Sequence, residues 1–80
     1  GIAEVLEAEV SHSSPILNYM VKKVNIPNIM QVIVVIRDGI TLFNTHALMF
    51  KPGDQVIMIV APHAIKKAER LFSNKAEYIF

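Results

Sequence analysis

Three histidines, His12, His46 and His63, are the first side chains to test for chemistry, because imidazole can bind a metal or move a proton. No two of them stand at the i, i+4 spacing of a helical zinc motif, and no Asp or Glu lies beside them at ligand spacing. The sequence has no cysteine, which excludes thiolate metal sites and disulfides. We therefore expect no metal site, and we expect the histidines to be solvated or to cap elements.

An enzyme would need a nucleophile beside a base, or paired carboxylates, and these side chains have simpler roles here. No serine stands in a G-x-S-x-G elbow, and Ser11, Ser13 and Ser14 lie where they can cap a helix. Asp38 and Asp54 fall in turns, and three glycines are too scattered to form a phosphate-binding loop. We predict that the protein is not an enzyme and that it requires no cofactor.

Arg37 ends an apolar run, so its planar fork of donors could reach an anion. The alternative is that Arg37 pairs with Asp38 or Asp54, or stays in water at the strand end. We favour this alternative, because surface arginines commonly pair loosely with nearby carboxylates.

Asn44, Thr45 and His46 form a compact polar cluster in an apolar neighbourhood. With Leu42 and Phe43 beside them, these side chains suit a pocket for a small polar ligand with a flat ring. A loop that satisfies its own backbone would need the same residue types. Both interpretations stay open at this point.

Two short stretches at the start of the chain predict a strand and a helix. Glu4, Glu7 and Glu9 alternate with apolar residues, which indicates an edge strand or a half-solvated strand. The stretch "SPILNYMVKKV" reads as a helix, because Pro15 suits the first helical position and four apolar residues then recur on one face. Those four residues are Leu17, Met20, Val21 and Val24.

The rest of the chain predicts three further strands and a second helix. "MQVIVVIRDG" is too uniformly apolar for a strand with a wet face, so we expect both of its faces to be covered. Asp38-Gly39 favours a hairpin that returns through "ITLF". "QVIMIVA" follows as a buried strand, and "PHAIKKAERLF" as a helix with Pro62 near its start. The predicted fold is α+β: a small mixed or antiparallel sheet with two helices, in the order β-α-β-β-β-α.

The composition and net charge of the chain limit the classes of partner that it could bind. Residues 1–80 make one small domain, and the 52% hydrophobic content favours an apolar association surface over a lone monomer. A net charge of +1 with both signs scattered along the chain gives no footprint for nucleic acid. No apolar run reaches the length of a membrane span. Because the chain begins with Gly1 rather than methionine, we expect a domain excised from a longer protein.

The central stretch resembles a known family. "VIVVIRDG", a short strand, a polar loop, "KPGDQVIMIVAP" and a helix ending "ERLF" are similar to the TrkA-C (RCK-C) regulatory domain of potassium channels, transporters and cation/proton antiporters. The match runs from about residue 3 to residue 72. Many members have a proline just ahead of the polar loop, where this chain has Phe43-Asn44.

The resemblance implies a cytoplasmic sensory module at the inner face of the membrane. It would form a homodimer and act on a membrane-embedded cation channel or transporter through dimer rearrangement. Some members bind a small effector at the dimer interface, and cyclic di-AMP is the known ligand in one subgroup. An effector here, cyclic di-AMP or another nucleotide, would be bound by Asp38, Ile40, Asn44, Thr45, His46 and Pro62. The alternative is a structural dimerisation module with no small-molecule ligand.

Overall fold

A five-stranded antiparallel sheet forms one layer of the molecule in the computed structural model, which describes residues 2–72 and 77–78. The strand order is β3-β2-β4-β1-β5. The strands are β1 (Glu4–Glu9), β2 (Met30–Arg37), β3 (Ile40–Leu42), β4 (Gln55–Val60) and β5 (Glu77–Tyr78). A one-turn 3-10 helix, η1 (Val21–Lys23), precedes β2. A second, η2 (Pro62–Ala64), leads into α1 (Ile65–Phe72), the one α-helix among the described residues. The predicted α+β class is confirmed, and the sheet is antiparallel rather than mixed.

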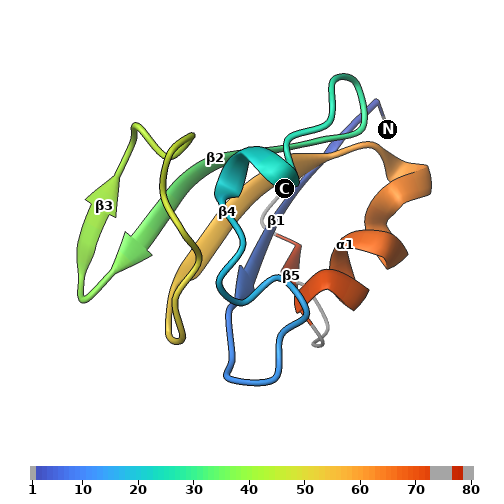
Figure 1. Cartoon of the computed structure of the whole chain (residues 1–80). Helices are drawn as coiled ribbons and strands as arrows, with labels where there is room; N and C mark the ends of the chain where they lie inside the picture. Colours follow the sequence, from blue (N-terminus) through green and yellow to red (C-terminus); the bar gives the residue numbers. More distant parts are fainter. Residues whose placement is uncertain (1, 73–76, 79–80) are drawn as a thin grey trace.

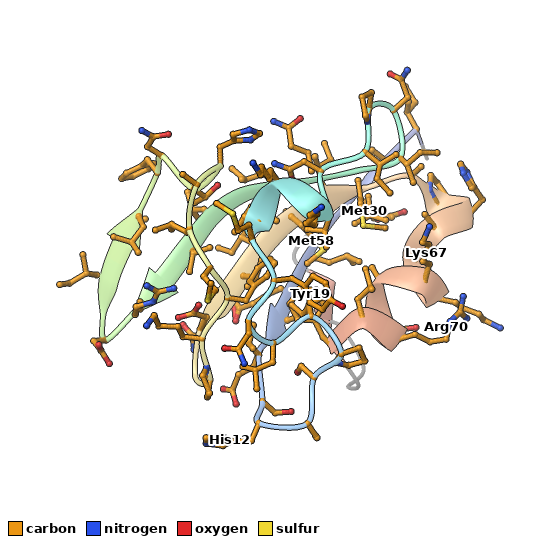
Figure 2. The ribbon with its side chains drawn as sticks, in the orientation of Figure 1. His12, Tyr19, Met30, Met58, Lys67 and Arg70 are labelled. Carbon is orange, nitrogen blue, oxygen red and sulfur yellow. The ribbon has the colours of Figure 1, made fainter. Side chains whose placement is uncertain are left out.

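One face of the sheet is packed and the other carries no described helix (Figure 1). Alternate residues of β1, β2 and β4 point to the packed face, as the period of two in a strand requires. Residues from η1 and α1 meet them there in one buried cluster. The inward residues are Leu6, Ala8, Val10, Met30, Val32, Val35, Val56, Met58 and Val60. Figure 2 labels Met30 and Met58, which point to this same side.

A β-bulge interrupts the alternation of β2. Val32 lies opposite Met58 and Val34 lies opposite Ile57, so the register shifts between them. Because Ile33 is the extra residue, Val32 and Val35 can both point inward although they are three positions apart. The bulge explains how a run as uniformly apolar as "QVIVVI" fits a sheet with one packed face.

The predicted first helix is wrong. Residues 15–24 form turns and the single 3-10 turn η1. Asn18 has a φ of 70°, which breaks any helix, and its backbone N–H bonds instead to the Phe50 carbonyl at 3.2 Å. Tyr19 accepts a hydrogen bond from the Phe50 N–H at 2.9 Å, so this segment pairs with a distant loop. Of the apolar positions expected to share a helical face, Val21 and Val24 are nevertheless buried in the core.

Ser14 does not cap a first helix, as the sequence suggested, but the end of α1. Its hydroxyl donates to the Phe72 carbonyl at 2.7 Å and accepts from the Ser11 N–H at 2.8 Å. The Phe72 carbonyl belongs to the last turn of α1, where carbonyls have no partner within the helix. A serine 58 positions away in the chain therefore caps the end of α1.

The predicted second helix is confirmed and covers part of the packed face. It begins with the turn at Pro62, and Ala64, Ala68 and Phe72 are buried. These residues recur every four positions, so they share the face of α1 that meets the sheet. The Phe72 ring packs edge-to-face on Phe50, with centroids 6.1 Å apart and planes at 81°.

Candidate functional site

The candidate site lies around the β2–β3 hairpin and the loop that follows it. Asp38 and Gly39 have φ values of 52° and 77°, which are the two left-handed residues of a type I′ turn. The hairpin predicted from this dipeptide is therefore confirmed. Asp38 is exposed at the tip, and Ile40 next to it is 62% exposed.

In the loop after β3, the side chains of the polar cluster alternate between exposed and buried. Asn44 and His46 are exposed, whereas Thr45 between them is only 5% exposed. A backbone hydrogen bond from Leu48 N–H to the Thr45 carbonyl, 2.9 Å, closes a turn that contains His46. Within the described part of the chain the Thr45 hydroxyl has no hydrogen-bond partner. Phe43, just before the cluster, is 76% exposed.

An ion pair between Arg37 and Asp54 connects β2 to the far end of this loop. Arg37 Nε lies 2.8 Å from Asp54 Oδ1, and its Nη2 donates to Asp54 Oδ2 and to the Met49 carbonyl, both at 2.9 Å. Asp54 is 1% exposed and also accepts the Lys51 N–H at 2.9 Å. The hydrogen bond with Asp54 raises the pKa of Arg37, and the charges of Asp54 and Asp38 add to the increase against the opposing effect of burial. Pairing with Asp54, the alternative favoured from the sequence, is the arrangement found.

Pro62 lies apart from the other predicted residues. It follows β4, whose last residue Val60 pairs with Met30 at the start of β2. Asp38 follows the opposite end of β2. Eight strand residues at about 3.3 Å each separate these ends by roughly 25 Å. The predicted residues therefore do not form one cluster in a single copy. Asp38 and Ile40 lie at the hairpin tip, whereas Asn44, Thr45 and His46 follow the other end of β3 (Figure 1). Pro62 lies apart from the hairpin tip, at the Met30 end of the sheet.

A hollow that the sequence did not predict lies at the Met30 end of the sheet. It has a volume of about 450 Å³ and is bounded by aliphatic side chains of the N-terminal segment, the turn before β2, and β4. Asn28, in that turn, has a φ of 65°, and Ile26-Pro27-Asn28 was the available turn signal. No charged side chain lines the hollow, and its lining includes none of the predicted effector residues. The lining residues are Ile2, Ala3, Ile26, Asn28, Ile29, Met30, Gln31, Ile59, Val60 and Ala61.

In residues 2–72 and 77–78, no three His, Asp or Glu side chains come together as metal ligands. No described helix is long and apolar enough to cross a membrane.

Comparison with known proteins identifies a family for this chain. The family model of the TrkA-C domain matches residues 5–73, which is most of the 80-residue chain and includes the hairpin, the polar loop and α1. No curated protein matches the chain. Since the family match extends over far more than half of the sequence, the chain belongs to the TrkA-C domain family.

Proposed function

We propose that this chain is the effector-sensing regulatory domain of a potassium or other cation channel or transporter. TrkA-C domains are regulatory and non-catalytic domains of transport systems, which gives the coarse function. The effector is a nucleotide, with cyclic di-AMP the first candidate, and it acts by favouring one arrangement of a homodimer. The domain works on the cytoplasmic side, held at the inner face of the membrane through its parent transporter.

The observation that carries the proposal is the Asn44-Thr45-His46 turn. Two exposed polar side chains flank Thr45, a buried residue whose hydroxyl has no hydrogen-bond partner in the described residues. A buried polar group without a partner is costly, so a ligand that bonds to it gains that free energy. Ile40 and Phe43, which precede the turn in the chain, are exposed and offer apolar surface for a flat ring.

The chemistry of the turn favours recognition of base edges over phosphate. His46 and Asn44 can both donate and accept hydrogen bonds, as an adenine edge requires. The Arg37 donors are engaged by Asp54 and Met49, so this side chain contributes little to an anion. Phosphates would depend on backbone N–H groups and on the positive field of nearby peptides.

The position of Pro62 supports a ligand shared by two copies. About 25 Å separates Pro62 from the hairpin within one copy, so a small ligand cannot touch both there. In a homodimer, Pro62 of one copy can approach the hairpin of the other. A ligand held by both copies would bind one dimer geometry more tightly and shift the population towards it.

A thermal-shift screen against cyclic dinucleotides, adenine nucleotides and cations tests the proposal. A ligand specific for the folded state adds about 2.7 kcal/mol at a hundredfold excess over its dissociation constant. That shift should be lost in His46→Ala and Asn44→Ala, and kept in His12→Ala. His12 is the matched control, because it is exposed on a turn at the far end of the molecule (Figure 2). A ligand whose affinity is unchanged by both loop variants would show that the turn is not the sensor.

The alternative is a structural dimerisation module without a small ligand. The uncovered sheet face, which is rich in aliphatic residues, favours this second candidate. No shift with any compound, from a chain that is folded and dimeric, would support it over the sensor.

A further inference from the structure

The outer surface of α1 carries cations. Lys66, Lys67 and Arg70 are exposed, and their spacing of three and four positions places them together on the helix. Ala68 and Phe72 are buried on the side of α1 that meets the sheet. The side of the helix that faces away from the core is therefore basic.

The turn η1 adds two cations on the same side of the sheet. Val21 and Val24 are buried in the cluster that also contains the inner side of α1, whereas Lys22 and Lys23 between them are exposed. None of these cations of α1 and η1 has an ion-pair partner among the described residues. We call them the basic face: Lys22, Lys23, Lys66, Lys67 and Arg70.

An aromatic side chain lies between the two parts of the basic face. The Ile16 N–H donates to the Leu71 carbonyl at 3.2 Å, so the segment that leads into η1 starts against the end of α1. Tyr19 in this segment is 56% exposed, and Figure 2 shows it between α1 and the turn of η1. A ring with an apolar body and a polar tip suits the boundary between lipid headgroups and acyl chains.

The carboxylates are distributed differently. Glu7 and Glu9 take outward positions of β1, on the face of the sheet opposite α1, and Asp38 is exposed at the hairpin tip. Two described carboxylates, Glu4 and Glu69, are on the helix side, and both are half-buried. Charges that are scattered along the sequence are therefore separated by the fold, with cations in excess on the helix side.

This separation is large compared with the range of a charge in physiological salt. The Debye length there is about 8 Å. The Cα trace measures 31 × 24 × 21 Å along its principal axes. A flat anionic surface against the helix side therefore interacts more strongly with the basic face than with the carboxylates of the far side. The chain can bind such a surface although its net charge is only +1.

We propose that the basic face contacts the anionic headgroups of the membrane beside which the parent transporter holds the domain. The inference rests on the proposed function for that location, since the cytoplasmic leaflet carries anionic lipids. Four of the five cations are lysines, which act as point charges without a fixed partner geometry. Recognition of nucleic acid depends more on the planar fork of arginine. A broad lipid surface therefore fits the basic face better than a nucleic acid does.

Vesicle co-sedimentation of the whole chain tests the contact. The chain should bind vesicles of phosphatidylglycerol and phosphatidylcholine, and should not bind vesicles of phosphatidylcholine alone. Lys22→Gln and Lys66→Gln should each weaken binding about fivefold, which corresponds to about 1 kcal/mol per lysine at an anionic surface. Lys51→Gln is the matched control, because Lys51 is exposed in the turn before β4 and outside the basic face. Its binding should equal that of wild type.

Salt and the tyrosine ring give a second measurement. Binding should fall steeply as salt is raised, because the headgroup charges are then screened. Tyr19→Ser should weaken binding at low and high salt alike, since the loss of an inserted ring does not depend on screening. Circular dichroism shows whether each variant is folded. Binding that does not respond to salt would overturn the electrostatic contact.

The other outcomes also decide the proposal. No binding to the anionic vesicles, or equal losses in Lys51→Gln and Lys66→Gln, would overturn it. Tighter binding to duplex DNA or to polyglutamate than to the vesicles would overturn it in favour of a nucleic acid or an acidic protein.

These results are independent of the effector screen, which contains no lipid. A nucleotide shift in a chain that does not bind vesicles rejects only the membrane contact. Vesicle binding without any nucleotide shift supports the contact, and in that case only the effector proposal fails.

Discussion

The Asp54 carboxylate connects separate parts of this small domain through its hydrogen bonds. It accepts two hydrogen bonds from Arg37 and one from the Lys51 backbone, and thereby joins the end of β2 to the turn before β4. The side chain of Arg37 is 24% exposed, so the pair is partly solvated rather than fully buried. Its contribution to stability should be intermediate between surface and buried pairs.

Asp54→Asn should lower the free energy of unfolding by about 2 kcal/mol, because it removes charge-assisted hydrogen bonds. Urea denaturation measures this change. Asp38→Asn is the matched control, since Asp38 is an exposed turn carboxylate and asparagine tolerates its positive φ. The control should change stability by less than about 0.5 kcal/mol. Equal losses in the two variants would contradict this role for Asp54.

The Arg37–Asp54 pair leads to a prediction about how stability depends on pH. The pKa of Arg37 is raised in the folded chain, mainly by its hydrogen bond with Asp54. Stability from a raised pKa is present below the pKa of the unfolded arginine and is lost only as the pH rises through the folded value. The arginine therefore stays charged throughout the neutral and mildly alkaline range. The difference between wild type and Asp54→Asn should stay constant in urea titrations from neutral to mildly alkaline pH, and a steady decrease would contradict it.

The residues of the candidate site differ in how far the sequence alone predicted their structural setting. Asp38-Gly39 predicted its turn from local chemistry alone, and the structure has that turn. Asn44, Thr45 and His46 were found as a polar cluster, but nothing local indicated that Thr45 would be buried and its neighbours exposed. The isolation of Pro62 depends on strand direction and pairing, which are properties of the whole sheet.

At the scale of elements, the β2–β3 hairpin and the end of α1 are held in different ways. The hairpin depends on residues adjacent in sequence. The end of α1 depends on Ser14, which reaches Phe72 across 58 positions of the chain, and on a 3.2 Å hydrogen bond from Ile16 N–H to the Leu71 carbonyl. Contacts of this second kind leave no local pattern in the sequence.

Ser14→Ala should lower the free energy of unfolding by about 2 kcal/mol, because the Phe72 carbonyl and the Ser11 N–H both lose a bond in a buried place. Thermal unfolding followed by circular dichroism measures the loss. Ser13→Ala, an exposed neighbour, is the control and should unfold like wild type. Faster hydrogen exchange at the end of α1 in Ser14→Ala alone would locate the effect there.

Strands were predicted better than helices for a physical reason. Uniform aliphatic runs indicated β2 and β4, because burial in a central sheet needs those side chains. The pattern of Leu17, Met20, Val21 and Val24 suits a helix equally well, but backbone bonds to Leu48 and Phe50 stabilise turns instead. Tertiary contacts that replace a weak local preference cannot be read from the segment itself.

At the scale of the whole molecule, charge and apolar surface are arranged on different sides. The exposed cations of α1 include Lys67 and Arg70, and they extend from the helix rather than over the sheet face opposite α1 (Figure 2). That face carries Ile57 and Ile59 in its centre, and no arginine or lysine is among the outward residues of β1, β2 and β4. This arrangement leaves a face that is apolar enough to associate and a remaining surface that stays solvated.

The proposed dimer predicts that stability depends on protein concentration. Because dissociation accompanies unfolding, each tenfold increase in concentration should raise the melting temperature of the wild type by about 3–5 °C where the dimer predominates. Differential scanning calorimetry over a concentration series measures the slope. A melting temperature that does not change with protein concentration would contradict the proposed homodimer.

The pairing of β1 with β4 also determines when the domain can fold. β1 lies near the start of the chain, and its partner begins at Gln55. A ribosome must therefore synthesise and release about sixty residues before the central strands can meet, while the β2–β3 hairpin can close within microseconds of its emergence. With its main pairing so far apart in sequence, the domain should fold in milliseconds or more slowly. During that interval β1 is an unpaired strand whose core residues Leu6 and Ala8 are uncovered, and it is a segment that a chaperone would have to protect.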